Sequence, residues 1–231
     1  MGKIIVLISA CNEATTIGFT IRSILDTGII DEVVVIDDGS KDKTSEVALK
    51  QGAKVIRNPS RFGKGNALNI GIESIKENDP AITVFLDGDL GNTASEVTKL
   101  VKPILDGETD MCIAGFNTKK GNKGYDVVKK VASKGIAMLT GCKLNWPLSG
   151  QRAMKTECLQ TVMPIKNGFD IEVAFTIDWM RAGFSVKEIT TDMSKNLEKP
   201  IKGFLGYGIQ ILYLFKVLIS RSIKPKQLNR N

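Results

Sequence analysis

Two short apolar runs in this chain of 231 residues each lead into a pair of aspartates. The run Glu-Val-Val-Val-Ile precedes Asp37 and Asp38, and the run Ala-Ile-Thr-Val-Phe-Leu precedes Asp87 and Asp89. Short β-branched runs are typical of buried strands, and ligands bind beyond the carboxyl ends of strands in open α/β sheets. Carboxylates at such an edge are costly unless cations or donors face them. We therefore predict that this edge binds a nucleotide together with a divalent ion.

Strand and helix patterns alternate along the chain, which predicts an α/β fold with a mostly parallel central sheet flanked by helices. Expected strands are 3–9, 32–37, 54–57, 82–86, 111–114 and 185–191. Expected helices are 15–27, 44–52, 67–77, 95–105, 127–139, 171–182 and 204–222. We predict one domain over 1–200, with a nucleotide-binding half (1–115) and an acceptor half (116–200), followed by a basic amphipathic helix and tail (201–231).

Composition excludes several classes of site. The chain has no histidine, which rules out Ser-His and Cys-His nucleophile pairs and imidazole metal ligation. No run of 18 uncharged apolar residues or secretory signal is visible, so we expect a cytoplasmic protein. Seven of the 32 basic residues and none of the 25 acidic residues lie in 199–231. The rest of the chain is balanced in charge, so no nucleic-acid partner is expected.

The first candidate site residues follow strands or precede helices. Asn12 and Glu13 fit a helix start, or a loop that faces a base or ribose. Asp38 fits a turn, or a carboxylate that accepts hydrogen bonds from a base or from ribose hydroxyls. Lys64 lies between two glycines before a helix, which is weak evidence for an anion site.

The segment Asp87-Gly88-Asp89 is spaced for a metal ion. Two carboxylates at this spacing can reach one hard cation, and that cation can bridge a diphosphate. Asp-Gly is also a hairpin-turn signal. The residues that follow, Leu-Gly-Asn-Thr-Ala-Ser, resemble a loop and a helix start, which favours the metal site.

Two later segments are candidates for an acceptor site. One is a loop rich in hydrogen-bond donors, placed before an expected helix, that could hold an anionic acceptor or be an ordinary capped loop. Its candidate residues are Ser149, Gly150, Gln151 and Arg152. The other segment carries Asp170 and Glu172 at a helix start, where acids favour the helix dipole or where one of them faces a reacting sugar.

The segment 204–219 is apolar nearly all round and is followed by basic residues. Two placements are open. The helix packs on the core or on a partner subunit of a homodimer, or it lies at the interface of an anionic membrane as a peripheral contact.

Taken together, the motifs resemble family 2-type glycosyltransferases with the GT-A (nucleotide-diphospho-sugar transferase) fold. The matching segments, in that family's order, are Leu-Ile-Ser-Ala-Cys-Asn-Glu from Leu7, Val-Ile-Asp-Asp-Gly-Ser from Val35, Gly-Lys-Gly-Asn-Ala from Gly63 and Phe-Leu-Asp-Gly-Asp from Phe85. The resemblance implies a nucleotide-sugar site. Its residues are Ser9, Asn12, Glu13, Asp38, Lys64, Asp87, Gly88 and Asp89. It also implies that Asp87 and Asp89 hold Mg²⁺ or Mn²⁺.

The second half is similar to glucosyl-3-phosphoglycerate synthases, through Pro-Leu-Ser-Gly-Gln-Arg-Ala and Gly-Phe-Asp-Ile-Glu-Val. Polyprenyl-phosphate hexose synthases are similar over the first half only. The chain departs from the phosphoglycerate-type pattern at Asn196, which stands where those enzymes carry a metal-ligating histidine. An amide oxygen can ligate a hard cation, although more weakly than a carboxylate.

The resemblance implies a hexosyltransferase that uses a nucleoside-diphosphate sugar, with UDP-glucose as the first candidate donor. The acceptor is a hydroxyl or a phosphate, with lipid-linked and cell-envelope molecules among the candidates. Asp170 or Glu172 is the candidate base, and Arg152 is a candidate catalytic or acceptor-binding group. The alternatives are a non-catalytic nucleotide-sugar-binding or membrane-associated scaffold and, ranked lower, a sugar nucleotidyltransferase.

Overall fold

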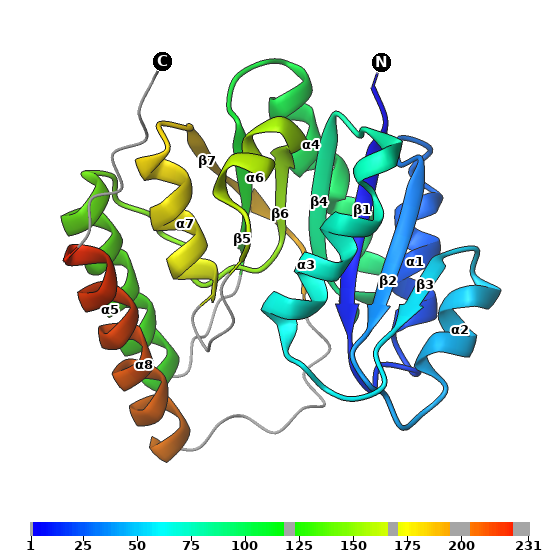
Figure 1. Cartoon of the computed structure of the whole chain (residues 1–231), viewed down its shortest axis with the longest axis horizontal. Coiled ribbons are helices and arrows are strands. Elements are labelled where there is room, and N and C mark those ends of the chain that lie inside the picture. The colour runs from blue at the N-terminus through cyan, green and yellow to red at the C-terminus, as the bar shows by residue number, and fades with distance from the viewer. Residues whose placement is uncertain (1, 118–122, 166–170, 195–203, 224–231) are drawn as a thin grey trace.

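A computed structural model describes residues 2–117, 123–165, 171–194 and 204–223 (Figure 1). Its centre is a seven-stranded sheet in the order β3-β2-β1-β4-β6-β5-β7. The strands are β1 (Ile4–Ala10), β2 (Glu32–Asp37), β3 (Lys54–Arg57), β4 (Ile82–Asp87), β5 (Met111–Phe116), β6 (Arg152–Lys155) and β7 (Val186–Thr191). All described neighbours pair in parallel except β6, which runs antiparallel between β4 and β5. The predicted α/β fold with a mostly parallel sheet is confirmed.

Helices cover both faces of the sheet (Figure 1). They are α1 (Ile17–Leu25), α2 (Thr44–Lys50), α3 (Lys64–Ser74), α4 (Val97–Leu105), α5 (Lys123–Thr140), α6 (Thr156–Val162), α7 (Ile171–Arg181) and α8 (Phe204–Ser222), with 3₁₀ turns η1 (Lys76–Asn78) and η2 (Gly91–Glu96). Side chains of α1, α2 and α4 pack on one face, and those of α3, α5, α6, α7 and α8 belong to the core on the other. The sheet is therefore buried on both sides, as its continuous apolar strands require.

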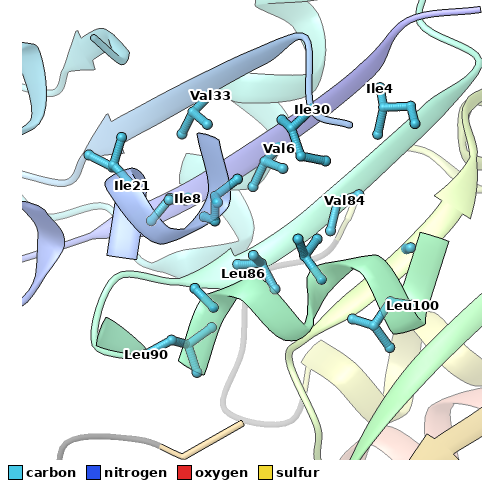
Figure 2. Packing of buried hydrophobic residues seen from close by; sticks show 14 of the residues in the cluster. Ile4, Val6, Ile8, Ile21, Ile30, Val33, Val84, Leu86, Leu90 and Leu100 are labelled. Carbon is cyan, nitrogen blue, oxygen red and sulfur yellow. The ribbon is translucent and has the colours of Figure 1, made fainter. Parts of the chain in front are cut away.

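The alternation of side chains along β1 divides the core. Ile4, Val6 and Ile8 point to the face covered by α1 and α4, where Figure 2 shows Ile8 beside Ile21 and Val6 beside Ile30. The intervening β1 residues point to the opposite cluster. This period-two pattern fixes the register, because a slip of one residue would exchange the two faces.

The register also brings the aspartate motifs together. Ala10 at the end of β1 pairs with Asp37 of β2, and Ser9 pairs with Asp87 of β4. The carboxyl ends of three adjacent parallel strands therefore meet at one edge of the sheet.

Several expected elements differ from the structure. Helix α3 begins at Lys64, three residues before the expected start, because the Asp38 carboxylate accepts the N–H groups of Phe62 and Gly63 just before it. Neither β6 nor α6 was expected. The loop that ends at Arg152 was expected to lead into a helix, and instead it enters the antiparallel strand β6.

Helix α3 lies close to the sheet at Gly71. A Cβ atom added there would lie 2.7 Å from Ile36 Cδ1 and 3.2 Å from Leu7 Cδ1. The position is buried against side chains of β1 and β2, so a larger side chain has no room.

Replacing Gly71 by Val should lower the free energy of unfolding by about 2 kcal/mol through overpacking. Gly208→Val is the matched control, because this helical glycine has nothing within 4 Å of an added Cβ. Urea denaturation of both variants measures the difference. Equal stability of the two variants would contradict the close packing of α3.

Candidate active site

The candidate site lies where β1, β2 and β4 end. Loops after these strands carry Asn12, Asp38 and Asp89, and the start of α3 adds Lys64. The loop before β6 and the start of α7 complete the edge from the second half of the chain. The structure thus brings most of the described candidate residues to one edge of the sheet.

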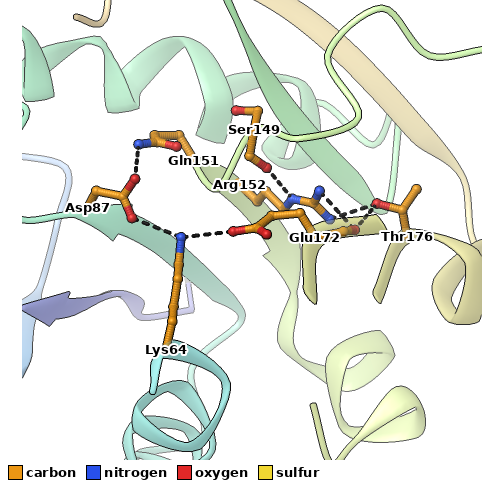
Figure 3. Close-up of polar contacts among 7 residues, drawn as sticks. All are labelled: Lys64, Asp87, Ser149, Gln151, Arg152, Glu172 and Thr176. Atoms are coloured by element: carbon orange, nitrogen blue, oxygen red, sulfur yellow. Dashed lines mark hydrogen bonds and ion pairs between the residues drawn. The ribbon is translucent and has the colours of Figure 1, made fainter. Parts of the chain in front are cut away.

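A shared lysine joins the two halves of this edge. Lys64 Nζ lies 2.9 Å from Asp87 Oδ1 and 3.0 Å from Glu172 Oε1 (Figure 3). The other Asp87 oxygen accepts a 2.8 Å hydrogen bond from Gln151 Nε2. Residues from α3, β4, α7 and the loop before β6 therefore form one polar network.

The charge of Lys64 is stabilised by its partners. Burial disfavours the ammonium form, but the nearby Asp87 and Glu172 carboxylates outweigh burial and raise the pKa of Lys64 above its ordinary value of 10.5. Because this pKa is raised on folding, the charged Lys64 contributes stability at neutral pH and up to its ordinary pKa of about 10.5, and the contribution is lost only as the pH rises above that value. The network is therefore fully charged on the lysine side at neutral pH.

Gly150 leaves the space that this network needs. A Cβ atom at this position would lie inside contact distance of Lys64 Nζ and 3.3 Å from Glu172 Oε1. A residue with any side chain would displace the ammonium from its two partners. Close backbone approach thus accounts for glycine at the centre of the predicted acceptor loop.

Arg152 holds this loop in place through buried hydrogen bonds. Its side chain is 2% exposed, and its guanidinium donates to Ser149 O, to Glu172 O and to Thr176 Oγ1 at 2.8–3.1 Å. Burial lowers the pKa of Arg152 to about 10, although Glu172 and Glu188 oppose this, so the group stays protonated at neutral pH. Three of its donors are directed to the protein's own carbonyl and hydroxyl oxygens, and an acceptor contact for Arg152 stays a prediction. It positions the loop and the start of α7.

Two buried polar atoms of the loop have no partner among the described residues. Ser149 Oγ and Gln151 Oε1 make no hydrogen bond, although the two residues are only 3% and 0% exposed. Buried polar groups in folded proteins are nearly always paired, so such atoms indicate a place where a ligand or water completes the bonding. Their position beside Asp87 makes them candidate ligand-binding groups.

On the other side of β1, two candidates bind the protein's own backbone. The Asp38 carboxylate is buried and accepts from Phe62 N, Gly63 N and Asn58 Nδ2 at 2.8–2.9 Å. Asn12 has a left-handed φ of 56°, and its Oδ1 accepts the N–H of Lys41 at 2.8 Å. These contacts shape the loops of the edge, and a nucleotide contact for either residue stays a prediction.

The metal candidates lie at the end of β4. Asp89 is half-buried and lines an open recess with Thr16 and Thr93, while Gly88 is buried close to the Glu13 side chain. Within the described part of the chain, no group of three or more Asp, Glu or Cys side chains is arranged to hold a metal. Two carboxylates nevertheless fit Mg²⁺ or Mn²⁺, because such ions keep open positions that diphosphate oxygens fill.

The remaining candidates are placed less fully. Ser9 is half-buried at the penultimate position of β1. Asp170 and Asn196 lie outside the described residues.

Sequence reasoning missed Thr176 and Glu188. Thr176 binds Arg152, and Glu188 accepts the backbone N–H groups of Asn145 and Trp146. The spacing of Thr176, four residues after Glu172 on one helix face, is a signal that could have identified it.

Comparison with known proteins gives a consistent result. A family model described as glycosyl transferase family 2 matches residues 5–165. An uncharacterized protein of Methanocaldococcus jannaschii is 32% identical over 228 residues, which cover 94% of this chain and 89% of that protein. Glucosyl-3-phosphoglycerate synthase of Mycobacterium tuberculosis is 35% identical over 197 residues, and the match covers 75% of this chain but only 59% of the synthase.

Solved structures of the M. tuberculosis synthase are also similar. Its complex with Mg²⁺ and UDP has a TM-score of 0.80 and 28% identity, covering 98% of this chain and 81% of that one. Its complex with Mn²⁺, UDP-glucose and phosphoglyceric acid has a TM-score of 0.78 and 27% identity, with the same two coverages. The agreement extends over both halves of the fold.

Replacing Lys64 by Met should lower the free energy of unfolding at pH 7 by about 2 kcal/mol, because Asp87 and Glu172 lose the ammonium between them. Urea denaturation at pH 7 measures this. The control Lys102→Met removes an exposed ion pair with Asp106 and should change stability little. A Lys64 variant as stable as the wild type would contradict the electrostatic role.

Proposed function

This chain belongs to glycosyltransferase family 2, and on that premise we propose that it transfers a hexose from a UDP-sugar to a small phosphate-bearing acceptor. UDP-glucose is the first candidate donor, and an acceptor of the phosphoglycerate type is the first candidate acceptor. The similarity to a synthase crystallised with UDP-glucose and phosphoglyceric acid supports both choices. Family membership favours this proposal over the non-catalytic scaffold and the sugar nucleotidyltransferase.

The observation that carries the proposal is the network around Lys64. It places a cation, two carboxylates and the unpartnered atoms of Ser149 and Gln151 at the edge where the aspartate motif ends. A diphosphate leaving group requires positive charge, and a sugar requires directional hydrogen bonds. One edge of the sheet therefore offers groups suited to both parts of a nucleotide sugar.

Asp87 and Asp89 would hold Mg²⁺ or Mn²⁺, which supplies Lewis-acid neutralisation of the departing diphosphate when it is bound. Lys64 adds a second positive charge on the same side. Gln151, which donates to Asp87, orients that carboxylate. Asn196 is a further candidate ligand by its place in the sequence.

Glu172 is the described carboxylate on the acceptor side of the network. In an inverting transfer it would accept the proton of the attacking hydroxyl, with Asp170 as the other candidate base. In a retaining transfer its role would be to hold Lys64, with which it is paired in the structure. Ser149 and Gly150 would position the acceptor in either case.

Purified protein incubated with UDP-glucose, 3-phosphoglycerate and Mn²⁺ should release UDP, and EDTA should abolish the release. Asp89→Asn should reduce the rate by about a hundredfold or more, because a neutral amide binds the cation more weakly. Asp26→Asn, at an exposed position directly after α1, is the control and should keep full activity. Undiminished activity of Asp89→Asn would refute the metal assignment.

Gly150→Ala should reduce turnover about a hundredfold, because the added methyl group moves Lys64 away from Asp87 and Glu172. Steady-state kinetics and thermal unfolding of the same samples separate this effect from loss of folding. Unchanged turnover in a folded variant would show that the observed position of Lys64 is unimportant for catalysis.

A lipid-phosphate acceptor is the second candidate, and the exposed apolar side chains of α8 favour it. Parallel assays with 3-phosphoglycerate, glycerate and polyprenyl phosphate distinguish the two. We expect glucosylation of 3-phosphoglycerate and little reaction with glycerate, which lacks the phosphate. Transfer to polyprenyl phosphate alone would support the second candidate in place of the first.

A further inference from the structure

Helix α8 exposes a continuous apolar stripe. Its members are Ile209, Leu212, Phe215, Ile219 and Ile223, the last of which directly follows the helix, and they are 43–73% exposed. Their spacing of three or four residues places them on one face of the helix. Exposed apolar residues are common singly, but a contiguous row of this kind marks an interaction surface.

The opposite face of α8 is packed firmly on the protein. Leu214 is fully buried, and Tyr207 and Leu218 lie against Gly124 and Gly135 of α5. The second contact lies eleven residues after the first in both helices, so the two helices run parallel and side by side, as Figure 1 shows. The apolar stripe therefore lies on the side of α8 that is turned away from its contacts with α5.

An ion pair between a buried arginine and a partly exposed aspartate also fixes the end of α8. Arg221, which is 8% exposed, binds Asp178 of α7 through two hydrogen bonds of 3.0 and 2.6 Å. This bidentate contact sets the rotation of the helix about its axis. The outward direction of the apolar stripe is thus part of the fold.

The charges of this helix pair select the kind of partner. Helices α5 and α8 contain six basic residues and one acidic residue. Lys130, Lys134 and Lys216 are exposed. After Ile223 the sequence adds three more basic residues and no acid. A second copy docked through the same stripe would bring like charges together, whereas an anionic surface would complement them.

We propose that the outer face of α8 binds the surface of an anionic lipid bilayer, with its apolar stripe in the interface and the lysines of α5 and α8 near the headgroups. None of the described helices has the length and apolarity needed to cross a membrane. This proposal concerns the outer face of α8, and it does not depend on the identity of donor or acceptor.

Sedimentation of the full chain with vesicles tests the proposal without an activity readout. We expect binding to phosphatidylcholine vesicles that contain about a third phosphatidylglycerol, weak binding to pure phosphatidylcholine, and release by high salt. The triple variant Leu212→Gln, Phe215→Gln, Ile219→Gln should bind the anionic vesicles at least about tenfold more weakly than the wild type. The replaced side chains are exposed, so circular dichroism should show an unchanged fold.

The matched control replaces three exposed apolar residues of other helices, Phe19, Leu49 and Leu105, by Gln and should bind like the wild type. A wild type that does not sediment with anionic vesicles overturns the proposal, and so does a stripe variant that binds as well as the wild type. Analytical ultracentrifugation covers the remaining case. A wild-type dimer that the stripe substitutions convert to a monomer, without vesicle binding, would assign the stripe to a second copy instead.

A second set of variants tests the charges. Lys130→Gln, Lys134→Gln and Lys216→Gln combined should weaken binding to anionic vesicles about tenfold and leave binding to neutral vesicles unchanged. The control replaces Lys41, Lys43 and Lys50, exposed lysines around α2, and should have little effect. Equal losses in the two sets would overturn the assignment of the basic surface to α5 and α8.

Discussion

The ammonium group of Lys64 is the point on which the site depends. It is shared by Asp87, 23 residues away in sequence, and by Glu172, 108 residues away, so one cation links the two halves of the chain at the site. Two carboxylates would repel each other at this edge without it. Gly150 permits the contact because it has no side chain, and Arg152 holds the surrounding backbone from the buried side. The site is thus pre-formed by the protein's own electrostatics.

Much of the fold could be predicted from the sequence, because strands buried on both faces are continuous apolar runs and the helices between them follow in regular alternation. The failures have physical causes. Strand β6 has only four residues and begins with a charged one, Arg152, whose burial depends on partners supplied by α7. The start of α3 looked like a glycine-rich loop, since the carboxylate that satisfies the N–H groups before it comes from Asp38, 24 and 25 residues earlier.

The location of the candidate site at one edge of the sheet could be predicted from the sequence, whereas its individual contacts could be predicted only in part. Residue types at strand ends indicated which edge would bind a ligand, and the register of β1, β2 and β4 agrees with this. Sequence alone does not reveal whether a polar side chain is used by the protein itself. Asp38 and Arg152 bind the chain's own backbone, whereas Ser149 and Gln151 retain unpartnered atoms. That distinction depends on packing between distant segments, which no local pattern records.

The central claim is that the end of β4 holds the donor diphosphate through a divalent cation. A crystal structure of the protein with UDP and Mn²⁺, with the metal located by its anomalous scattering, tests this most directly. The account predicts one Mn²⁺ coordinated by Asp89, by Asp87 or by both, with UDP oxygens completing its shell beside Lys64. A Mn²⁺ ion bound elsewhere, or UDP bound away from the ends of β1 and β4, would contradict the account.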